Sequence, residues 1–225
     1  MRDNIKDAKY YEDYLAQNMK RITRFQEQLK MLKSDNVMGR RECAAFIGCL
    51  YWSRICALYS SGSCIHDIEE IYPLFLEYLV QGVMPAEGYF DVIDAISLGV
   101  LLDAKGSLPA LKLIVQQTNM RDKLTDTLLH SMDDTWPIVE SNDRCAWFFE
   151  FLNCAEIERG DYLKRYLTKR WYRDHRDASW YDCHKSSFDI YVGYWSFEVA
   201  AVAKIYGVQD SLEWPYYPYD LVHKI

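Results

Sequence analysis

The segment GYWSFEVAAVAKIYG, residues 193–207, is apolar on nearly all sides and begins and ends with glycine. A helix that is apolar all round is buried, whereas a surface helix keeps one polar side. The segment therefore predicts a central core helix. It contains Glu198, and a buried carboxylate must be hydrogen-bonded or paired. We interpret Trp195 and Glu198 as structural residues, with Glu198 held by a tyrosine hydroxyl, an indole or an arginine of another helix.

The residues on either side of this segment divide into one amphipathic stretch and one proline-rich tail. GDYLKRYLTKRWYRDHRD, residues 160–177, alternates aromatic and basic residues and predicts a surface helix. WPYYPYDLVH, residues 214–223, is too rich in proline for a helix, and its tyrosines are expected to pack back onto the protein. Further helices are predicted over 121–130 and 144–158.

The N-terminal region carries the longest helical pattern. Apolar residues recur at spacings of three and four from residue 3 to residue 33, and Asp3 is a suitable N-cap. The apolar stripe leaves two alternatives open, because it can pack against its own bundle or pair with a second copy in a homodimer.

Four more helices are expected before residue 120. Pro73 requires a kink in one of them or a start near Tyr72. The predicted helices are 40–61, stopped at Gly62; one through Ile68, Ile71, Phe75 and Leu79; 86–104, ended at Gly106; and 108–117. Strand patterns are nearly absent, so the fold class is all-α, a multi-helix bundle with two packed helical halves.

Composition limits the classes of function. The chain has 225 residues, half of them hydrophobic, enough for one large domain or two small lobes. The charged N-terminus and the lack of a long apolar run argue against secretion and membrane insertion, which leaves a cytoplasmic location. Seven cysteines without a CxxC pair predict reduced, buried thiols. A net charge of −7 argues against nucleic-acid binding and favours a basic, small or neutral partner.

The acidic charge is concentrated in one region. No Lys or Arg occurs from Ile55 to Ala104, although 26 basic residues in 225 would place about six in such a window. Helical spacing places three acids on one face of the third helix and three on one face of the fourth. These six are Asp67, Glu70, Glu77, Glu87, Asp91 and Asp94. Like charges at these spacings repel, so a basic partner would compensate them.

No catalytic or metal-binding motif is convincing, and no cofactor is expected. His175, Arg176 and Asp177 follow the order of a kinase catalytic loop, but the accompanying motifs are missing. Cys183 with His184 and His175, or Cys64 with His66, lack the spacing of a zinc site. Asp103 and Lys105 resemble the carboxylate-x-Lys pair of magnesium-dependent nucleases, which requires a preceding strand where this sequence predicts a helix. We therefore predict a protein that is not an enzyme.

Three segments carry a family resemblance. Residues 193–211 and 216–223 resemble the C-terminal domain of the immunity proteins to polymorphic nuclease effectors, the PoNe immunity family, and residues 2–30 are similar to its N-terminal domain. The resemblance implies helical domains over 1–120 and 121–225. It also implies protection of a bacterium against a DNase toxin delivered by type VI or related secretion, through direct binding of that toxin in the cytoplasm.

The resemblance does not supply contact residues, so these come from the charge pattern. A DNase needs a basic surface for phosphates, and the six acids would occupy or border that surface. The alternative is a generic helical scaffold or regulatory protein that has no toxin partner.

Overall fold

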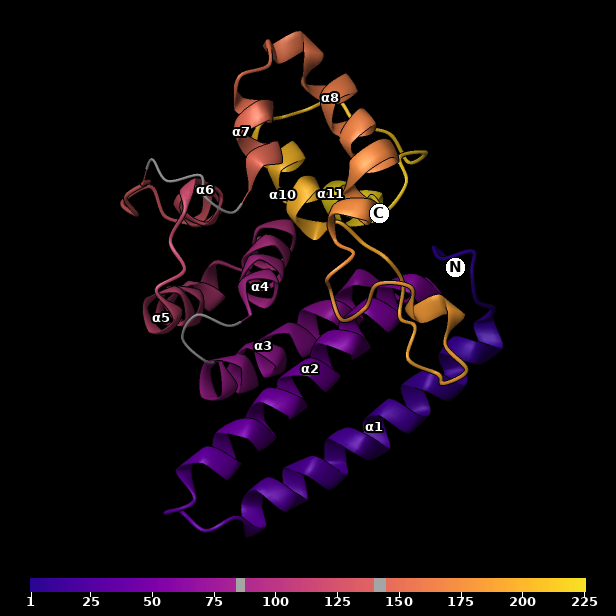
Figure 1. Ribbon diagram of the computed structural model, residues 1–225, viewed down its shortest axis with the longest axis vertical. Coiled ribbons are helices and arrows are strands. Elements are labelled where there is room, and N and C mark those ends of the chain that lie inside the picture. The colour runs from indigo at the N-terminus through magenta and orange to yellow at the C-terminus, as the bar shows by residue number, and fades with distance from the viewer. Residues whose placement is uncertain (84–87, 140–144) are drawn as a thin grey trace. The chain divides into compact units, whose positions relative to one another are not determined.

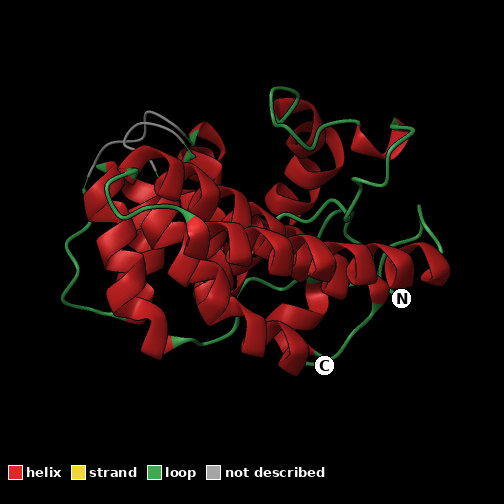
Figure 2. Ribbon diagram, turned by 90° about the horizontal axis from the view of Figure 1, so that it is seen from below, coloured by secondary structure: helices red, strands yellow, loops and turns green. Residues whose placement is uncertain are grey.

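The computed structural model of the protein describes residues 1–83, 88–139 and 145–225. Helices and turns account for the regular structure, and no strand occurs in these ranges (Figure 2). The predicted all-α class is confirmed. By its internal contacts the chain forms two compact units. Unit 1 is Met1–Glu87 with Asp182–Gly193, and unit 2 is Gly88–Tyr181 with Tyr194–Ile225.

Unit 1 is a layer of three long helices. They are α1 (Ala8–Met31), α2 (Val37–Ser61) and α3 (Ile65–Gly82), and α2 lies between the other two (Figure 1). α2 ends at Gly62, whose φ of 85° is the left-handed conformation that glycine adopts without strain. A Cβ on Gly82 would lie 2.4 Å from the Cα of Ala45, so α2 and α3 approach closely because this residue is glycine.

Asp3 is the centre of a buried polar cluster in unit 1 and not the helix N-cap, which is Asp7. The Asp3 carboxylate accepts hydrogen bonds from the hydroxyls of Tyr11 (2.9 Å) and Tyr191 (2.7 Å). It also accepts the backbone N–H groups of residues 5 and 6. These bonds join the start of the chain to the segment 182–193, which is far away in sequence.

Replacing Asp3 by alanine is expected to lower the free energy of unfolding by about 2 kcal/mol, because two buried tyrosine hydroxyls lose a charged acceptor. Urea unfolding followed by circular dichroism measures the change. Asp13→Ala is the control, because Asp13 is exposed and its carboxylate pairs with the exposed side chain of Lys9. Equal losses in the two variants would show that the Asp3 cluster contributes nothing.

Unit 2 is built around α10 (Phe197–Ile205), which packs against α4 (Tyr89–Leu101) and α6 (Lys123–Met132). Residues 199–203 are all buried, so the predicted core helix is confirmed. The other helices are α5 (Leu108–Thr118), α7 (Ala146–Leu152), α8 (Arg159–Tyr166), α9 (Tyr172–Asp174) and α11 (Tyr219–His223). A π-helical turn, η3 (Leu167–Trp171), joins α8 to α9.

Several predicted boundaries were wrong. Of the two alternatives given for Pro73, the start near Tyr72 is wrong, because α3 continues on both sides of this proline. α4 ends at Leu101, with Leu102 as its C-cap, and not at Gly106, because Asp103 adopts a left-handed conformation with φ of 54°. The C-terminal tail contains the short helix α11, which was predicted to be irregular, although Trp214 and Tyr217 are buried as expected.

The cysteine prediction needs correction, and so does the expected lack of a long apolar helix. No disulfide joins any of the seven cysteines, but Cys49 and Cys64 are exposed and Cys145 and Cys154 are half-buried instead of buried. One described helix, α2, is long and apolar enough to cross a membrane by length and composition, contrary to expectation. Two thirds of that window (67%) is buried inside the structure, and the core helix of a soluble protein passes the same test.

Candidate partner-binding site

The acidic face of α3 is formed by Asp67, Glu70 and Glu77. Glu70 and Glu77 are exposed, and Asp67 is half-buried in the first helical turn, where a negative charge is favourable. The opposite side of α3 is buried through Ile68, Tyr72, Phe75, Leu76 and Leu79. Amphipathic periodicity therefore directs these carboxylates to solvent, as the sequence predicted.

The acidic face of α3 has little cationic compensation. Its close partner is His66, whose ring nitrogens lie 3.4 Å from Glu69 and 3.6 Å from Glu70. Within the described ranges, no Lys or Arg forms an ion pair with a carboxylate of α3. The face thus presents negative charge to any molecule that approaches it.

The acids of α4 are arranged differently. Asp91 keeps an exposed surface, although desolvation of its carboxyl raises its pKa. Asp94 is half-buried, and burial raises its pKa well above the usual value, with the charges of Glu198 and Asp91 acting in the same direction. α4 is apolar around most of its circumference, so Asp94 does not lie on an open polar face as expected.

The structure does not show the six predicted acids as one surface. Asp67, Glu70 and Glu77 belong to unit 1, and Asp91 and Asp94 belong to unit 2. Glu87 lies outside the described residues. The acidic face of α3 is therefore the part of the predicted site that the structure brings together.

Glu198 is held inside unit 2 by hydrogen bonds. The indole Nε1 of Trp171 and the hydroxyl of Ser196 each donate to Glu198 Oε1 at 2.7 Å, and all three residues are buried. Of the three partners considered for Glu198, the structure shows the indole. Trp195 is half-buried and precedes α10 instead of lying within it. Because Glu198 is enclosed by its own chain, it is not available to a partner protein.

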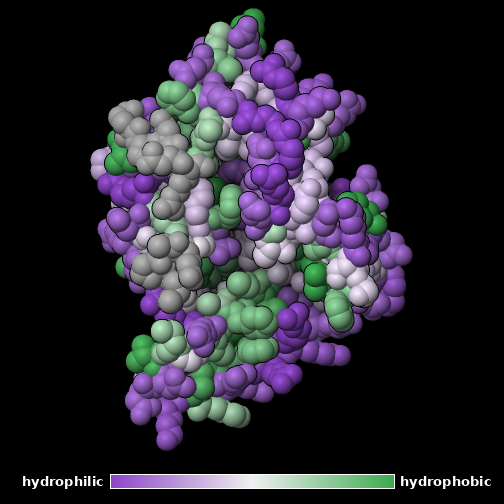
Figure 3. Space-filling model, viewed as in Figure 1, coloured by the Kyte–Doolittle hydropathy of each residue, from purple (hydrophilic) through white to green (hydrophobic). Residues whose placement is uncertain are grey.

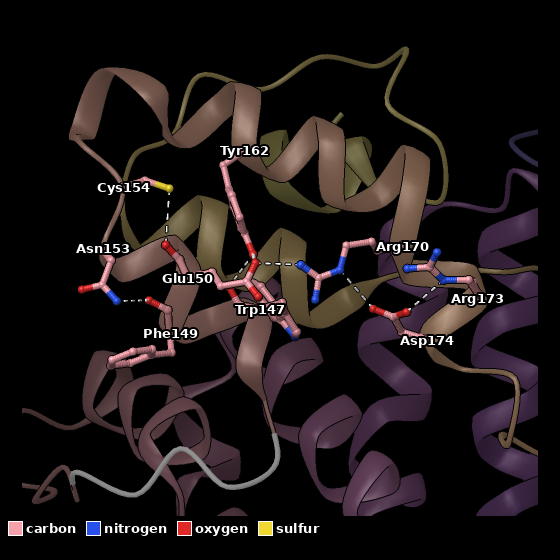
Figure 4. A network of polar contacts seen from close by, with 9 residues as sticks. All are labelled: Trp147, Phe149, Glu150, Asn153, Cys154, Tyr162, Arg170, Arg173 and Asp174. Atoms are coloured by element: carbon pink, nitrogen blue, oxygen red, sulfur yellow. Dashed lines mark hydrogen bonds and ion pairs between the residues drawn. The ribbon is translucent and has the colours of Figure 1, made fainter.

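A polar network joins α7 to the residues that carry Trp171 (Figure 4). Glu150 of α7 accepts hydrogen bonds from Tyr162 (3.0 Å) and Arg170 (2.7 Å). Arg170 also bonds to Asp174 at 3.3 Å, and Arg173 reaches the same carboxylate. Positively charged Arg170 lowers the pKa of Glu150. The network fixes the π-helical turn that brings Trp171 to Glu198, a structural role that residue spacing alone did not predict.

The residues considered for catalysis or metal binding do not form such a site in the described ranges. Asp103 follows α4, and its carboxylate pairs with Lys204 (2.8 Å) and Lys224. The strand that a carboxylate-x-Lys nuclease requires is thus replaced by a helix. No group of three or more His, Cys, Asp or Glu side chains in the described part of the chain is placed to hold a metal ion.

These features are those of an all-α protein with an exposed acidic helix face. Two family models match the sequence, the N-terminal domain of PoNe immunity proteins (PoNi) over residues 2–111 and the C-terminal domain over residues 120–221. Together the two matches cover almost the whole chain. The chain therefore belongs to the PoNe immunity protein family, which confirms the resemblance found in the sequence.

A solved structure supports the fold. The crystal structure of protein PA2201 from Pseudomonas aeruginosa aligns with a TM-score of 0.75 and 20% sequence identity, over 99% of this chain and 89% of the other. At this identity the similarity concerns the fold alone. A comparison with curated proteins finds no significant sequence match.

Proposed function

We propose that this chain is an immunity protein that binds a cognate DNase toxin in the cytoplasm and neutralises it by direct contact, without catalysis of its own. The toxin would be one delivered by type VI or related secretion. The observation that carries the proposal is the match of both PoNe immunity domains across residues 2–111 and 120–221. Immunity to a nuclease toxin is what membership of this family implies.

The acidic face of α3 is the proposed centre of the toxin contact. A nuclease attracts DNA phosphates with basic side chains, and Asp67, Glu70 and Glu77 offer carboxylates of the same sign as phosphate. Such complementarity accelerates association and weakens with salt. Asp91, exposed in unit 2, is proposed as a further contact, and the roles of Glu87 and Asp94 remain predictions.

Calorimetric titration against the nuclease domain encoded beside this gene, at low and at high salt, tests the proposal. We expect nanomolar binding that weakens as salt is added, together with inhibition of DNA cleavage. Absence of binding at micromolar concentrations would overturn the immunity function and favour a helical scaffold. Binding that does not depend on salt would support the immunity function and show that the acidic face of α3 is not the contact surface.

Neutralising the acidic face of α3 is expected to weaken binding at least tenfold at low salt and to reduce the salt dependence. The variant combines Asp67→Asn, Glu70→Gln and Glu77→Gln, which keep the side-chain volumes. A matched control, Glu12→Gln with Glu27→Gln and Asp35→Asn, removes three exposed charges elsewhere in unit 1. If both triple variants lose the same affinity, overall charge and not the α3 face determines binding.

A further inference from the structure

Unit 2 contains a groove of about 860 Å³, and none of its lining residues belongs to α3. One wall is formed by residues 156–164 and the other by residues 206–214, and we call it the α8 groove. The walls meet at Gly160, where a Cβ would lie 2.9 Å from the carbonyl oxygen of Gln209. This close approach leaves room for glycine only and fixes the two walls against each other.

Each wall carries a large aliphatic side chain that is exposed to solvent. Ile157, in the 3-10 turn η2 (Glu156–Glu158), is 93% exposed, and Leu212, between groove residues Ser211 and Trp214, is 68% exposed. In Figure 3 a small green area lies where Figure 1 shows the turn between α7 and α8. Single exposed apolar residues are ordinary, but two beside one groove indicate a contact surface.

The turn that carries Ile157 is fixed by contacts of the residues that follow it. Arg159 lies over the rings of Phe151 (5.2 Å) and Tyr206 (5.1 Å), with its guanidinium mostly covered. The backbone N–H of Glu158 donates to the carbonyl of Ala155 at 2.9 Å. These contacts fix the backbone of the turn that carries Ile157. Less conformational entropy is therefore lost when a partner covers this side chain.

Exposed charge around the α8 groove is predominantly negative. Glu156 and Asp161 line it, and Glu158 and Glu213 lie beside lining residues, all four exposed. The exposed bases there are Lys164 and its neighbour Arg165, which covers the ring of Tyr162. Asp210 is occupied, because it accepts hydrogen bonds from Tyr217 (2.5 Å) and His223 (2.7 Å).

We propose that the α8 groove is a second contact surface for the same nuclease toxin, and the inference rests on the proposed function. The groove takes a toxin segment in which an apolar side chain is flanked by basic residues. The apolar side chain packs between Ile157 and Leu212, and the basic residues face Glu156, Glu158 and Asp161. An apolar anchor inside a charged rim is the usual arrangement of a protein interface.

The test is titration of the full chain against the nuclease domain encoded beside its gene, using Ile157→Ser, Leu212→Ser and the double variant. Serine removes the apolar contact without changing the charge. We expect each single variant to bind about tenfold more weakly, as for the loss of one buried aliphatic side chain, and the double variant to bind more weakly still. Thermal melts should be unchanged, because both side chains are exposed.

Leu113→Ser, an exposed leucine on α5 of the same unit, is the matched control and should bind as the wild type does. A double variant with wild-type affinity would overturn the groove inference while leaving the immunity function in place. A wild-type chain that does not bind the toxin would overturn the proposed function itself. If Ile157→Ser instead changes the sedimentation of the free protein, a second copy covers the groove and the inference is wrong.

Discussion

Replacing Trp171 by alanine is expected to lower the free energy of unfolding by about 4 kcal/mol, the range for a large buried aromatic. Trp171 is buried among the rings of Trp180, Tyr216 and His175, whose centroids lie 4.8 to 5.4 Å from its own. The substitution also removes the indole donor of the buried Glu198 carboxylate. Urea unfolding followed by far-ultraviolet circular dichroism measures the loss.

Two further variants separate the causes. Trp171→Phe keeps most of the packing and removes the hydrogen bond to Glu198, so we expect an intermediate loss of about 1 to 3 kcal/mol. Phe188→Ala removes an exposed aromatic ring and should change stability little. If Trp171→Ala and Phe188→Ala unfold at the same urea concentration, Trp171 does not hold the core of unit 2.

Replacing Asp126 by alanine is the second substitution with a large expected effect, a loss of about 3 kcal/mol. Asp126 is fully buried and accepts hydrogen bonds from Arg121 (2.8 and 3.1 Å), the indole of Trp136 (2.8 Å) and the backbone of Val139 (3.0 Å). Breaking a buried ion pair by removing one partner costs about 3 to 5 kcal/mol, because the other charge is left uncompensated. Since Arg121 is partly exposed, we expect the loss for Asp126→Ala at the lower end of this range.

Unfolding in urea tests the expected loss for Asp126→Ala by comparison with Asp134→Ala. Asp134 is an exposed aspartate of the same segment. Asp126→Asn retains a carbonyl acceptor for Trp136 and should fall between the two. A loss for Asp126→Ala no greater than for Asp134→Ala would show that solvent replaces the four hydrogen bonds at no cost.

Helical periodicity was sufficient to predict the fold class, the buried helix α10 and the exposed acids of α3, because each depends on the pattern within one helix. The same reasoning failed for Asp94. Its spacing placed it opposite one apolar stripe, but α4 is surrounded by protein on most sides. How many sides of a helix are covered depends on tertiary packing, and this cannot be predicted from the residue spacing within the helix.

Contacts between distant segments were beyond sequence reasoning. Asp3 precedes α1 and by its position in the sequence is a suitable N-cap, whereas its hydrogen-bond partner Tyr191 lies almost at the other end of the chain. Asp126 was not singled out, although Arg121 and Trp136 are near it in sequence. The groove residue Ile157 gave one weak signal, an isoleucine between two glutamates, which an ordinary helix would also show.

The division of the chain into units has a consequence for its synthesis. Unit 1 contains residues 182–193, where the backbone carbonyls of Tyr191 and Val192 accept hydrogen bonds from Tyr10 and Ser60. A ribosome synthesises the N-terminus first, so α1, α2 and α3 emerge long before residues 182–193, which complete unit 1. Unit 1 thus matures only near the end of translation, and a nascent chain stalled before residue 193 should remain sensitive to protease in its first half.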